Sequence, residues 1–300
     1  MQTKINKHSP AIELKDLSII FDQGTKNEYK LFDKINYSFE ANKIHFIAGD
    51  SGSGKTVLIS HFNGLNKTKN GKIAIFGEPI KIKGNKITNI KSIRSKIGMV
   101  FQFAEYQLFK STIEKDIIFG PLNFKVKSDE AKKRAKKYIQ EVGLNTSFLP
   151  RDPFGLSGGQ KRRVAIAGIL AIEPDILVFD EPTAGLDPNG EKEMMNIFLN
   201  LKKAGKTIII VTHSMNQAIE IADNVVVVGD GKILKSGTTY DIFQDEELIK
   251  KTSLSTPLIF SIIKKLIDRD EKYKVLIKKQ PRTIEKLVHE LNLLEGGKNA

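Results

Sequence analysis

The sequence predicts an α/β fold built around a parallel sheet, and two patterns carry this prediction. Apolar, β-prone runs of the kind buried on both faces of a parallel sheet alternate with segments of helical periodicity. A glycine-rich turn also joins the β-prone run 44–48 to the helical segment 55–62. Strands that alternate with helices in this way indicate an α/β domain.

The remaining elements follow in a regular order. A β-prone run, Lys96 to Phe101, precedes a helix-rich stretch from about Ser111 to Gly143, in which Ser128 is expected to cap the helix 129–142. The other expected elements are a helix at 158–171, buried strands at 175–179 and 207–212, a helix at 189–203, and a hairpin with strands 224–228 and 232–235. Beyond about residue 240 the chain becomes Lys-rich and helical, so we expect a main domain at 1–240 and a small helical appendage at 241–300.

The composition indicates the cellular compartment of the protein but does not identify its ligand. The 300 residues are 40% hydrophobic, and the absence of cysteine excludes disulfides and thiolate metal sites. Residues 1–10 lack the apolar core of a signal peptide, and no apolar run is long enough to span a membrane, so a soluble, cytosolic chain is expected. The net charge of +13 favours a polyanion, whether nucleotide phosphate, nucleic acid or an anionic membrane surface. The basic cluster 132–137 is best interpreted as a solvated helix face.

One loop matches the phosphate-binding pattern G-x-x-x-x-G-K-[ST] between an expected strand and an expected helix. Its residues are Gly49, Asp50, Ser51, Gly52, Ser53, Gly54, Lys55 and Thr56. Glycines let backbone N–H groups turn toward phosphate oxygens, and the helix N-terminus adds partial positive charge. We expect Lys55 to reach the β- and γ-phosphates of a nucleotide and the Thr56 hydroxyl to bind Mg²⁺.

Two acids, Asp180 and Glu181, end the apolar run 176–179. In open α/β sheets ligands bind beyond the carboxyl ends of the strands, so both carboxylates should lie near the phosphates. Asp180 is suited to hold Mg²⁺, directly or through water, and Glu181 is suited to orient and deprotonate an attacking water. An acid pair at this place can also be a helix cap, and the presence of Lys55 favours the catalytic interpretation.

A second loop narrows the class. Leu156-Ser157-Gly158-Gly159-Gln160 resembles the signature sequence of ABC ATPases. A serine-capped helix would explain Ser157 and one glycine, but not the whole string. A hydroxyl and exposed N–H groups at the head of a helix resemble an anion site, so one chain would carry two half-sites for the same phosphate.

The resemblance to ABC ATPases covers about residues 10–240 and implies further site residues. Gln102 matches the Q-loop glutamine, which senses Mg²⁺ and water and links to the membrane partner. Asp187 resembles the D-loop aspartate that contacts the opposite subunit, and His213 resembles the switch histidine that bonds the γ-phosphate. Phe21 is the candidate for the aromatic that stacks on adenine, with Tyr29 nearby. The fold implied is a P-loop NTPase of ABC type with a RecA-like core, an antiparallel β subdomain, a helical signature subdomain at about 104–165, and the appendage.

Within ABC ATPases the chain resembles the energy-coupling factor (ECF) transporter ATPases, and most of all the second of their two paired types. The stretches that carry this resemblance are 101–109, 119–124, 162–168 and 180–188. The sequence departs from the family pattern at Ala104, where proline is usual, and at Thr56-Val57, where Ser-Thr is usual. Val57 is counted with the nucleotide-binding loop.

The resemblance implies ATP and Mg²⁺ as cofactors and several partners. These are a sister ATPase in a heterodimer or a second copy in a homodimer, a transmembrane T subunit, and indirectly an S subunit that binds a vitamin or a metal ion. It also implies a peripheral location on the cytoplasmic face of the cell membrane, and no nucleic-acid partner. Residues 106–109 would either contact the membrane subunit or pack within the helical subdomain.

On this interpretation two subunits enclose two ATP molecules, each held by the Lys55 loop of one chain and the Ser157 loop of the other. Glu181 would activate water, while His213 and Lys55 would stabilise the γ-phosphate. Thr56, Gln102 and Asp180 would hold Mg²⁺.

Two rival functions remain to be weighed against this interpretation. One is a soluble ABC ATPase acting on nucleic acid or the ribosome, which the basic charge makes worth considering. DNA-repair relatives, however, would insert a coiled coil between the Lys55 and Ser157 loops, and translation relatives usually carry two cassettes in one chain. The other is a non-ABC nucleotide kinase, which leaves the run 156–160 unexplained.

Overall fold

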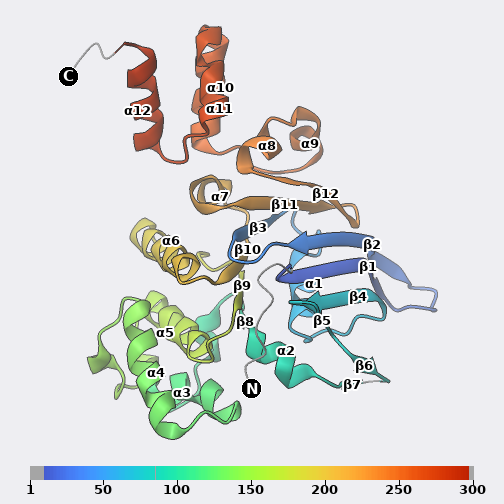
Figure 1. The fold of residues 1–300 in the computed structure, drawn as a ribbon, viewed down its shortest axis with the longest axis vertical. Coiled ribbons are helices and arrows are strands. Elements are labelled where there is room, and N and C mark those ends of the chain that lie inside the picture. Colours follow the sequence, from blue (N-terminus) through green and yellow to red (C-terminus); the bar gives the residue numbers. More distant parts are fainter. Residues whose placement is uncertain (1–9, 85, 297–300) are drawn as a thin grey trace.

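The computed structural model describes residues 10–84 and 86–296, and a six-stranded sheet lies at its centre (Figure 1). The strand order is β12-β11-β3-β10-β9-β8. The strands are β3 (Ile44–Ala48), β8 (Ile97–Val100), β9 (Ile176–Asp180), β10 (Thr207–Val211), β11 (Asn224–Gly229) and β12 (Lys232–Gly237). All neighbours in this sheet pair in parallel except β12, which pairs with β11 as an antiparallel hairpin. The predicted α/β class with a parallel sheet is therefore confirmed.

A four-stranded antiparallel sheet lies beside the parallel one, with the order β2-β1-β4-β5 (Figure 1). Its strands are β1 (Ile12–Phe21), β2 (Tyr29–Phe39), β4 (Asn70–Ile75) and β5 (Glu78–Pro79), and a separate small hairpin joins β6 (Ile82–Lys83) to β7 (Lys86–Ile87). Buried side chains of this sheet, including Leu17 and Phe32, share one hydrophobic cluster with Ile47 and Val178 of the parallel sheet. The two sheets are therefore packed through a common core.

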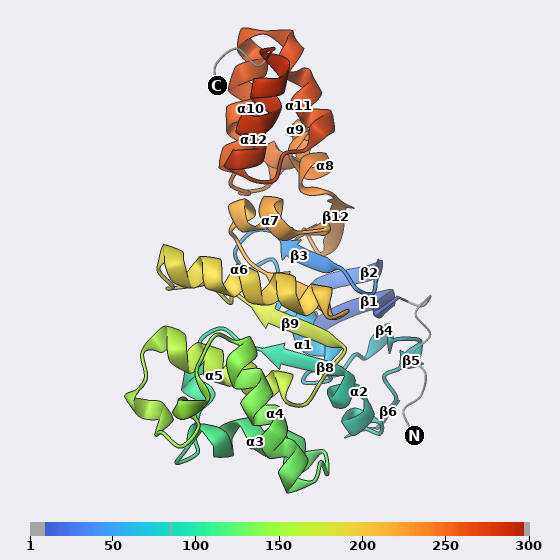
Figure 2. The same cartoon turned by 60° about the vertical axis from the view of Figure 1, so that its left-hand side comes forward.

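The helices fall into three groups around the sheets (Figures 1 and 2). Those near the nucleotide loop and the central sheet are α1 (Lys55–Phe62), α2 (Ile90–Lys96), α6 (Pro188–Lys203) and α7 (Met215–Ile221). At one end of the molecule lie α3 (Ile113–Asn123), α4 (Ser128–Glu141) and α5 (Gly158–Leu170). At the other end lie α8 (Thr239–Phe243), α9 (Glu246–Lys251), α10 (Leu258–Arg269), α11 (Val275–Lys279) and α12 (Ile284–Leu294).

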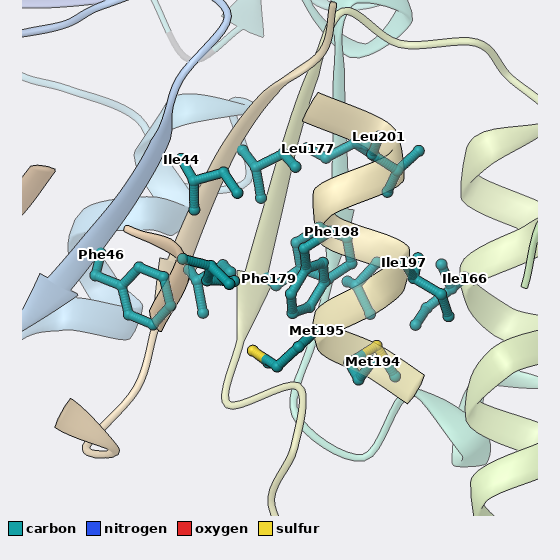
Figure 3. Close-up of a cluster of buried hydrophobic side chains, with 14 of the residues drawn as sticks. Ile44, Phe46, Ile166, Leu177, Phe179, Met194, Met195, Ile197, Phe198 and Leu201 are labelled. Atoms are coloured by element: carbon teal, nitrogen blue, oxygen red, sulfur yellow. The ribbon is translucent and has the colours of Figure 1, made fainter. Parts of the chain in front are cut away.

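The central strands are buried on both faces, as their continuous apolar sequence requires. Alternate residues of β9 enter different cores: Leu177 and Phe179 join the cluster that includes α6, whereas Val178 joins the cluster that includes α1. On the α6 side the rings of Phe179 and Phe198 lie 4.7 Å apart between centroids (Figure 3). This packing on both sides fixes the position of the carboxyl end of β9, where the acids lie.

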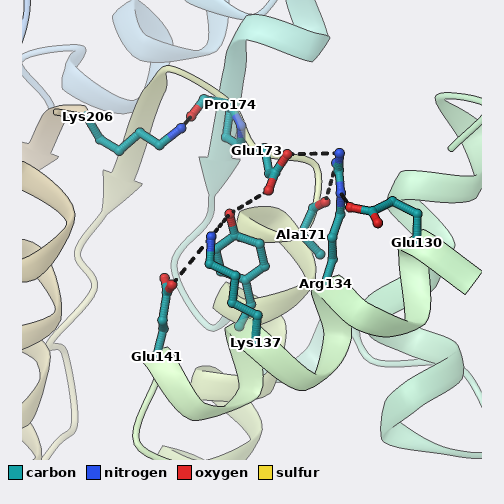
Figure 4. A network of polar contacts seen from close by, with 9 residues as sticks. Glu130, Arg134, Lys137, Glu141, Ala171, Glu173, Pro174 and Lys206 are labelled. Atoms are coloured by element: carbon teal, nitrogen blue, oxygen red, sulfur yellow. Dashed lines mark hydrogen bonds and ion pairs between the residues drawn. The ribbon is translucent and has the colours of Figure 1, made fainter. Parts of the chain in front are cut away.

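A polar network holds α4 against the turn that leads from α5 into β9 (Figure 4). Arg134 pairs with Glu130 in its own helix and, at 2.9 Å, with Glu173 in the turn. Its guanidinium also donates to the carbonyl oxygen of Ala171 at 3.2 Å. The Tyr138 hydroxyl donates to the Glu173 carboxylate at 3.1 Å, and burial raises the pKa of this phenol above its usual value. Lys132, Lys133, Lys136 and Lys137 are exposed, as expected for a solvated basic face. Arg134, which was counted with them, is instead held by Glu173 and Ala171 and is only partly exposed.

Several expected element limits need correction. Lys96 ends α2 instead of opening a strand, and Ser128 is the first residue of α4 rather than its cap. Lys127 occupies the capping position, with extended backbone and no side-chain cap bond. Asp129 and Glu130 put negative charge in the first turn, which stabilises a helix start without a capping side chain.

The other expected helices and strands lie within one or two residues of their observed limits. The proposed subdomain limits at 165 and 240 fall inside α5 and α8, and these divisions stay proposals. Within residues 10–84 and 86–296, no helix has both the length and the apolar character to cross a bilayer. Most of the polar N-terminal stretch 1–10 and of the polar end 296–300 lies outside the described residues.

Candidate nucleotide-binding site

The phosphate loop runs from the end of β3 to the start of α1 in a backbone path that requires glycine. Gly54, the residue before the helix, has a φ of 90°, and Gly49 has a φ of 149°. A Cβ atom on Gly49 would lie 2.1 Å from the carbonyl oxygen of Val228 in β11. Lys55 is buried, and its Nζ donates to the carbonyl oxygens of Gly49 and Asp50, both at 2.8 Å. The loop therefore folds around its own lysine.

Opposite charges surround the Lys55 amine. Burial lowers the pKa of Lys55, an effect opposed by the carboxylates of Glu181, Asp50 and Asp180. Asp180 ends β9 and is buried. Burial raises the pKa of Asp180, opposed by the nearby Thr56 hydroxyl and by the charge of Lys55. The acids therefore favour the charged form of Lys55, and its ammonium group is suited to balance negative phosphate charge.

Glu181 has an unusual backbone and a side-chain oxygen without a hydrogen-bond partner. Its φ is 45°, a left-handed conformation that costs a residue with a Cβ of the order of 1–3 kcal/mol. His213, just beyond β10, brings its Nε2 to 3.4 Å from Glu181 Oε1. The angles do not make this a hydrogen bond, so Oε1 is buried without a partner among the described residues. Burial also raises the pKa of Glu181, with His213 opposing the rise.

A cleft of about 650 Å³ brings most of the predicted site together. Gln102 enters it from the segment after β8, and Phe21 and Leu31 enter it from β1 and β2. The other lining residues are Ser51, Gly52, Gly54, Lys55, Thr56, Val57, Asp180, Glu181, Ala184, Val211 and His213. Tyr29 pairs with Phe21 across the two strands but lines a neighbouring hollow instead, so the position of Phe21 favours it as the adenine-stacking ring. Its role stays a prediction.

The Ser157 loop is not part of this cleft. Ser157 caps α5: its hydroxyl accepts from the Gln160 N–H at 3.3 Å, and the Gln160 side chain accepts from the Ser157 N–H at 3.1 Å. Ser157, Gly159 and Asp187 instead line a separate hollow of about 430 Å³, and Ser157 and Asp187 are both exposed. The chain thus presents two distinct half-sites, and the described residues do not join them within one copy.

The donor set in the cleft fits Mg²⁺. Thr56, Asp180 and Gln102 line the cleft together, so a hydroxyl, a carboxylate and an amide oxygen are available there. Among the described residues, no three His, Cys, Asp or Glu side chains form a metal cage of their own. Mg²⁺ is usually held by one or two carboxylates, with waters and substrate phosphates as further ligands, so a protein cage is not needed.

Sequence reasoning missed some residues that shape the site. The side chain of Leu31 lies against Gly54, where a Cβ would come within 2.8 Å of it, and no motif marks this residue. The carboxylate of Asp50 accepts a hydrogen bond from the backbone N–H of Ser253 at 2.7 Å, which joins the phosphate loop to the segment after α9. Such contacts between distant positions have no signature in the local sequence.

The site combines a glycine loop, a buried lysine and two acids at the end of a strand. This combination is typical of ATP-binding, ATP-hydrolysing domains of the P-loop class. The profile of the ABC transporter family matches residues 32–184. The chain resembles the energy-coupling factor transporter ATP-binding protein EcfA2 of Mycoplasma pneumoniae, with 46% identity over 94% of this chain and 93% of the relative. For EcfA2 of Mycoplasmoides gallisepticum the identity is 48%, over 94% of this chain and 90% of the relative.

Solved structures give the same result. The fold is similar to that of cbiO1 from Clostridium perfringens, described as part of the ABC transporter complex cbiONQ, with a TM-score of 0.71 and 34% identity over 85% of this chain and 99% of that one. It is also similar to the ATP-binding cassette MJ0796 in a dimer bound to ADP and Pi, with a TM-score of 0.66 and 29% identity over 76% of this chain and 98% of that one. The chain belongs to the ABC transporter family and, within it, to the energy-coupling factor transporter ATP-binding proteins. It is therefore an ATPase coupled to transport, as predicted.

Proposed function

We propose that this chain energises an ECF-type importer that takes up a vitamin or a metal ion through separate membrane subunits. The observation that carries the proposal is the separation of the two half-sites: Lys55 and the acids share one cleft, whereas Ser157 and Asp187 share another. Each ATP would be enclosed by the Lys55 loop of one subunit and the Ser157 loop of a facing one. The facing subunit is a sister ATPase or a second copy.

The residues of the cleft divide the chemical work. The oxygen of a water molecule attacks the γ-phosphorus while Glu181 accepts its proton, and the bond from that phosphorus to the bridging oxygen breaks to leave ADP. Glu181 lines the cleft, has a left-handed backbone, and keeps its buried Oε1 without a hydrogen-bond partner among the described residues. Lys55 and His213 stabilise the charge that develops on the phosphoryl oxygens. Mg²⁺, held by Thr56, Gln102 and Asp180, would supply further neutralisation of phosphate charge.

An apolar groove beside the Q-loop supports a membrane partner. It has a volume of about 300 Å³ between α3 and α5, and its lining includes Leu108, Phe119 and Ile169. Phe119 is partly exposed and packs edge-to-face on the exposed ring of Phe109, with centroids 5.0 Å apart. Exposed aromatics beside an apolar groove are typical of a protein contact. We assign it to an apolar helix of the transmembrane T subunit, and we propose that the ATPase acts as a peripheral protein on the cytoplasmic face.

Co-purification from membranes tests this function. A tagged wild-type chain should be isolated together with a polytopic membrane protein and a second ATPase, whereas Phe119→Glu should lose the membrane protein and keep normal ATP binding. The control is Ile82→Glu, which changes an exposed apolar residue on the distant hairpin β6–β7 and should retain both partners.

Two outcomes would contradict the proposal. A wild-type chain that co-purifies with RNA or DNA and no membrane protein would favour the soluble ABC ATPase instead. Retention of the membrane protein by Phe119→Glu would remove the groove from the proposed contact.

A further inference from the structure

Arg162 is a buried arginine whose side chain joins its own helix to two other segments of the catalytic domain. It lies in α5, five residues beyond Ser157, and its relative exposure is 5%. Its Nε and Nη2 donate to the two carboxylate oxygens of Glu105, at 3.0 and 2.9 Å. Its Nη1 donates to the backbone carbonyls of Pro182 at 3.1 Å and Ala184 at 2.7 Å.

These partners belong to segments with different tasks. Glu105 lies in the short turn 104–107, three residues after Gln102, and the neighbouring aromatics Phe103 and Tyr106 are exposed. Pro182 and Ala184 lie one and three residues after Glu181, and Ala184 lines the nucleotide cleft. One guanidinium therefore joins the exposed turn after the Q-loop to the backbone that sets the direction of Glu181.

The ion pair between Arg162 and Glu105 is bidentate and largely shielded from solvent. Burial acts to raise the pKa of Glu105, but the hydrogen bonds and charge of Arg162 outweigh it, and the pKa stays below its usual value. A planar fork bound to both carboxylate oxygens fixes orientation as well as distance, which a single ammonium group does not. A shift of the turn 104–107 would therefore displace the guanidinium and, with it, its contact to Pro182 and Ala184.

Arg134 shows what a purely structural arginine of this type looks like. It also pairs with carboxylates and donates to a backbone carbonyl, that of Ala171 (Figure 4). Its partners, however, lie in α4 and in the turn before β9, and none of them lines the nucleotide cleft. Arg134 and Arg162 therefore make the same kinds of hydrogen bond and ion pair, and they differ only in the segments of the chain that they join.

We propose that Arg162 is a positioning residue that couples the turn 104–107 to the geometry of Glu181 through Glu105 on one side and the carbonyls of Pro182 and Ala184 on the other. The inference rests on the proposed function, because it assigns that turn to the surface facing the membrane partner. It predicts that loss of Arg162 slows hydrolysis without weakening the binding of ATP.

The test compares variants in the complete transporter complex. Arg162→Gln should lower kcat of ATP hydrolysis about 10–100-fold, with the Kd for ATP changed less than about twofold. Arg162→Lys should recover only part of the rate, because one ammonium cannot serve the carboxylate and both carbonyls. Glu105→Gln should slow hydrolysis less than Arg162→Gln, because the contacts of Nη1 remain.

Two controls keep stability apart from positioning. The double variant Arg162→Gln and Glu105→Gln leaves no buried carboxylate without its partner. If the single variant Arg162→Gln folds poorly, kcat is measured on this double variant instead. Because both variants break the same link, their effects on kcat should be less than additive. Arg134→Gln should lower the Tm without changing kcat per folded complex.

The possible outcomes separate this inference from the function on which it rests. A double variant with wild-type kcat, or equal losses of kcat in Arg162→Gln and Arg134→Gln, would overturn the positioning role. A loss of ATP affinity in parallel with kcat would overturn it as well. Unchanged turnover in Glu181→Gln would instead overturn the proposed catalytic mechanism, whatever the result for Arg162.

Discussion

The two helix starts that would meet at one phosphate are built on different principles. The loop before α1 encloses a buried lysine and faces two acids whose pKa values burial raises. The start of α5 has no such charges: Ser157 is exposed and satisfies its own helix through a reciprocal bond with Gln160. The first half-site contains the groups for catalysis, whereas at the start of α5 the second offers a hydroxyl and backbone dipoles, with the side chains of Arg163, Asp187 and Glu193 lining the same hollow. The difference teaches that ATP binding and ATP turnover should be separable by mutation.

The largest effect should come from removing the buried cation. Lys55→Met is expected to weaken ATP binding about 100-fold and to lower turnover by about 10³-fold, because the phosphates lose their only buried charge partner in the loop. The matched control is Lys206→Met. Lys206 is partly buried, donates to the Pro174 carbonyl at 2.7 Å and has its pKa lowered by burial, but it lies at the amino end of β10. Isothermal titration with ATP and a phosphate-release assay would measure both variants, and equal losses in both would contradict the prediction.

A smaller and more selective effect is expected at the second half-site. Ser157→Asp keeps a good N-cap, so α5 should stay intact, but it places a carboxylate against the phosphate held by the facing chain. Repulsion of about 3 kcal/mol between this carboxylate and the phosphate would raise the activation free energy and correspond to about 100-fold slower turnover. ATP binding to the isolated chain should stay at the wild-type Kd. If Ser157→Asp weakens binding to the isolated chain, the two half-sites are not separate.

The smallest effect concerns the adenine base. Phe21→Leu should weaken ATP binding about tenfold, since stacking on an aromatic side chain contributes about 1–3 kcal/mol per base. Tyr29→Leu is the control, because Tyr29 lies opposite Phe21 in the strand pair but outside the cleft, and its Kd should stay within about twofold. The same titration with GTP would show whether the stacking is independent of the base. A reversed order of the two effects would assign the adenine contact to Tyr29.

Sequence reasoning located the phosphate loop, β9 and the head of α5, because at these places motif and backbone geometry constrain each other. Gly49 and Gly54 are visible in the sequence, and their positive φ values follow from the loop they form. The pairing order of the antiparallel sheet was not predicted, since it depends on contacts between strands far apart in the chain. The cap of α4 was predicted wrongly at Ser128 because local propensity does not decide between adjacent residues. The partners of Arg162 belong to the same class of tertiary contact.

The hydrogen bonds from Lys55 to the carbonyls of Gly49 and Asp50 have a consequence for how readily a nucleotide is captured. A flexible glycine segment would lose conformational freedom when a ligand orders it, and that loss would subtract from affinity. Here the Lys55 side chain holds the phosphate loop in a curled shape. A triphosphate that binds therefore needs only to replace the carbonyl oxygens of Gly49 and Asp50 with phosphate oxygens as acceptors for the Lys55 amine.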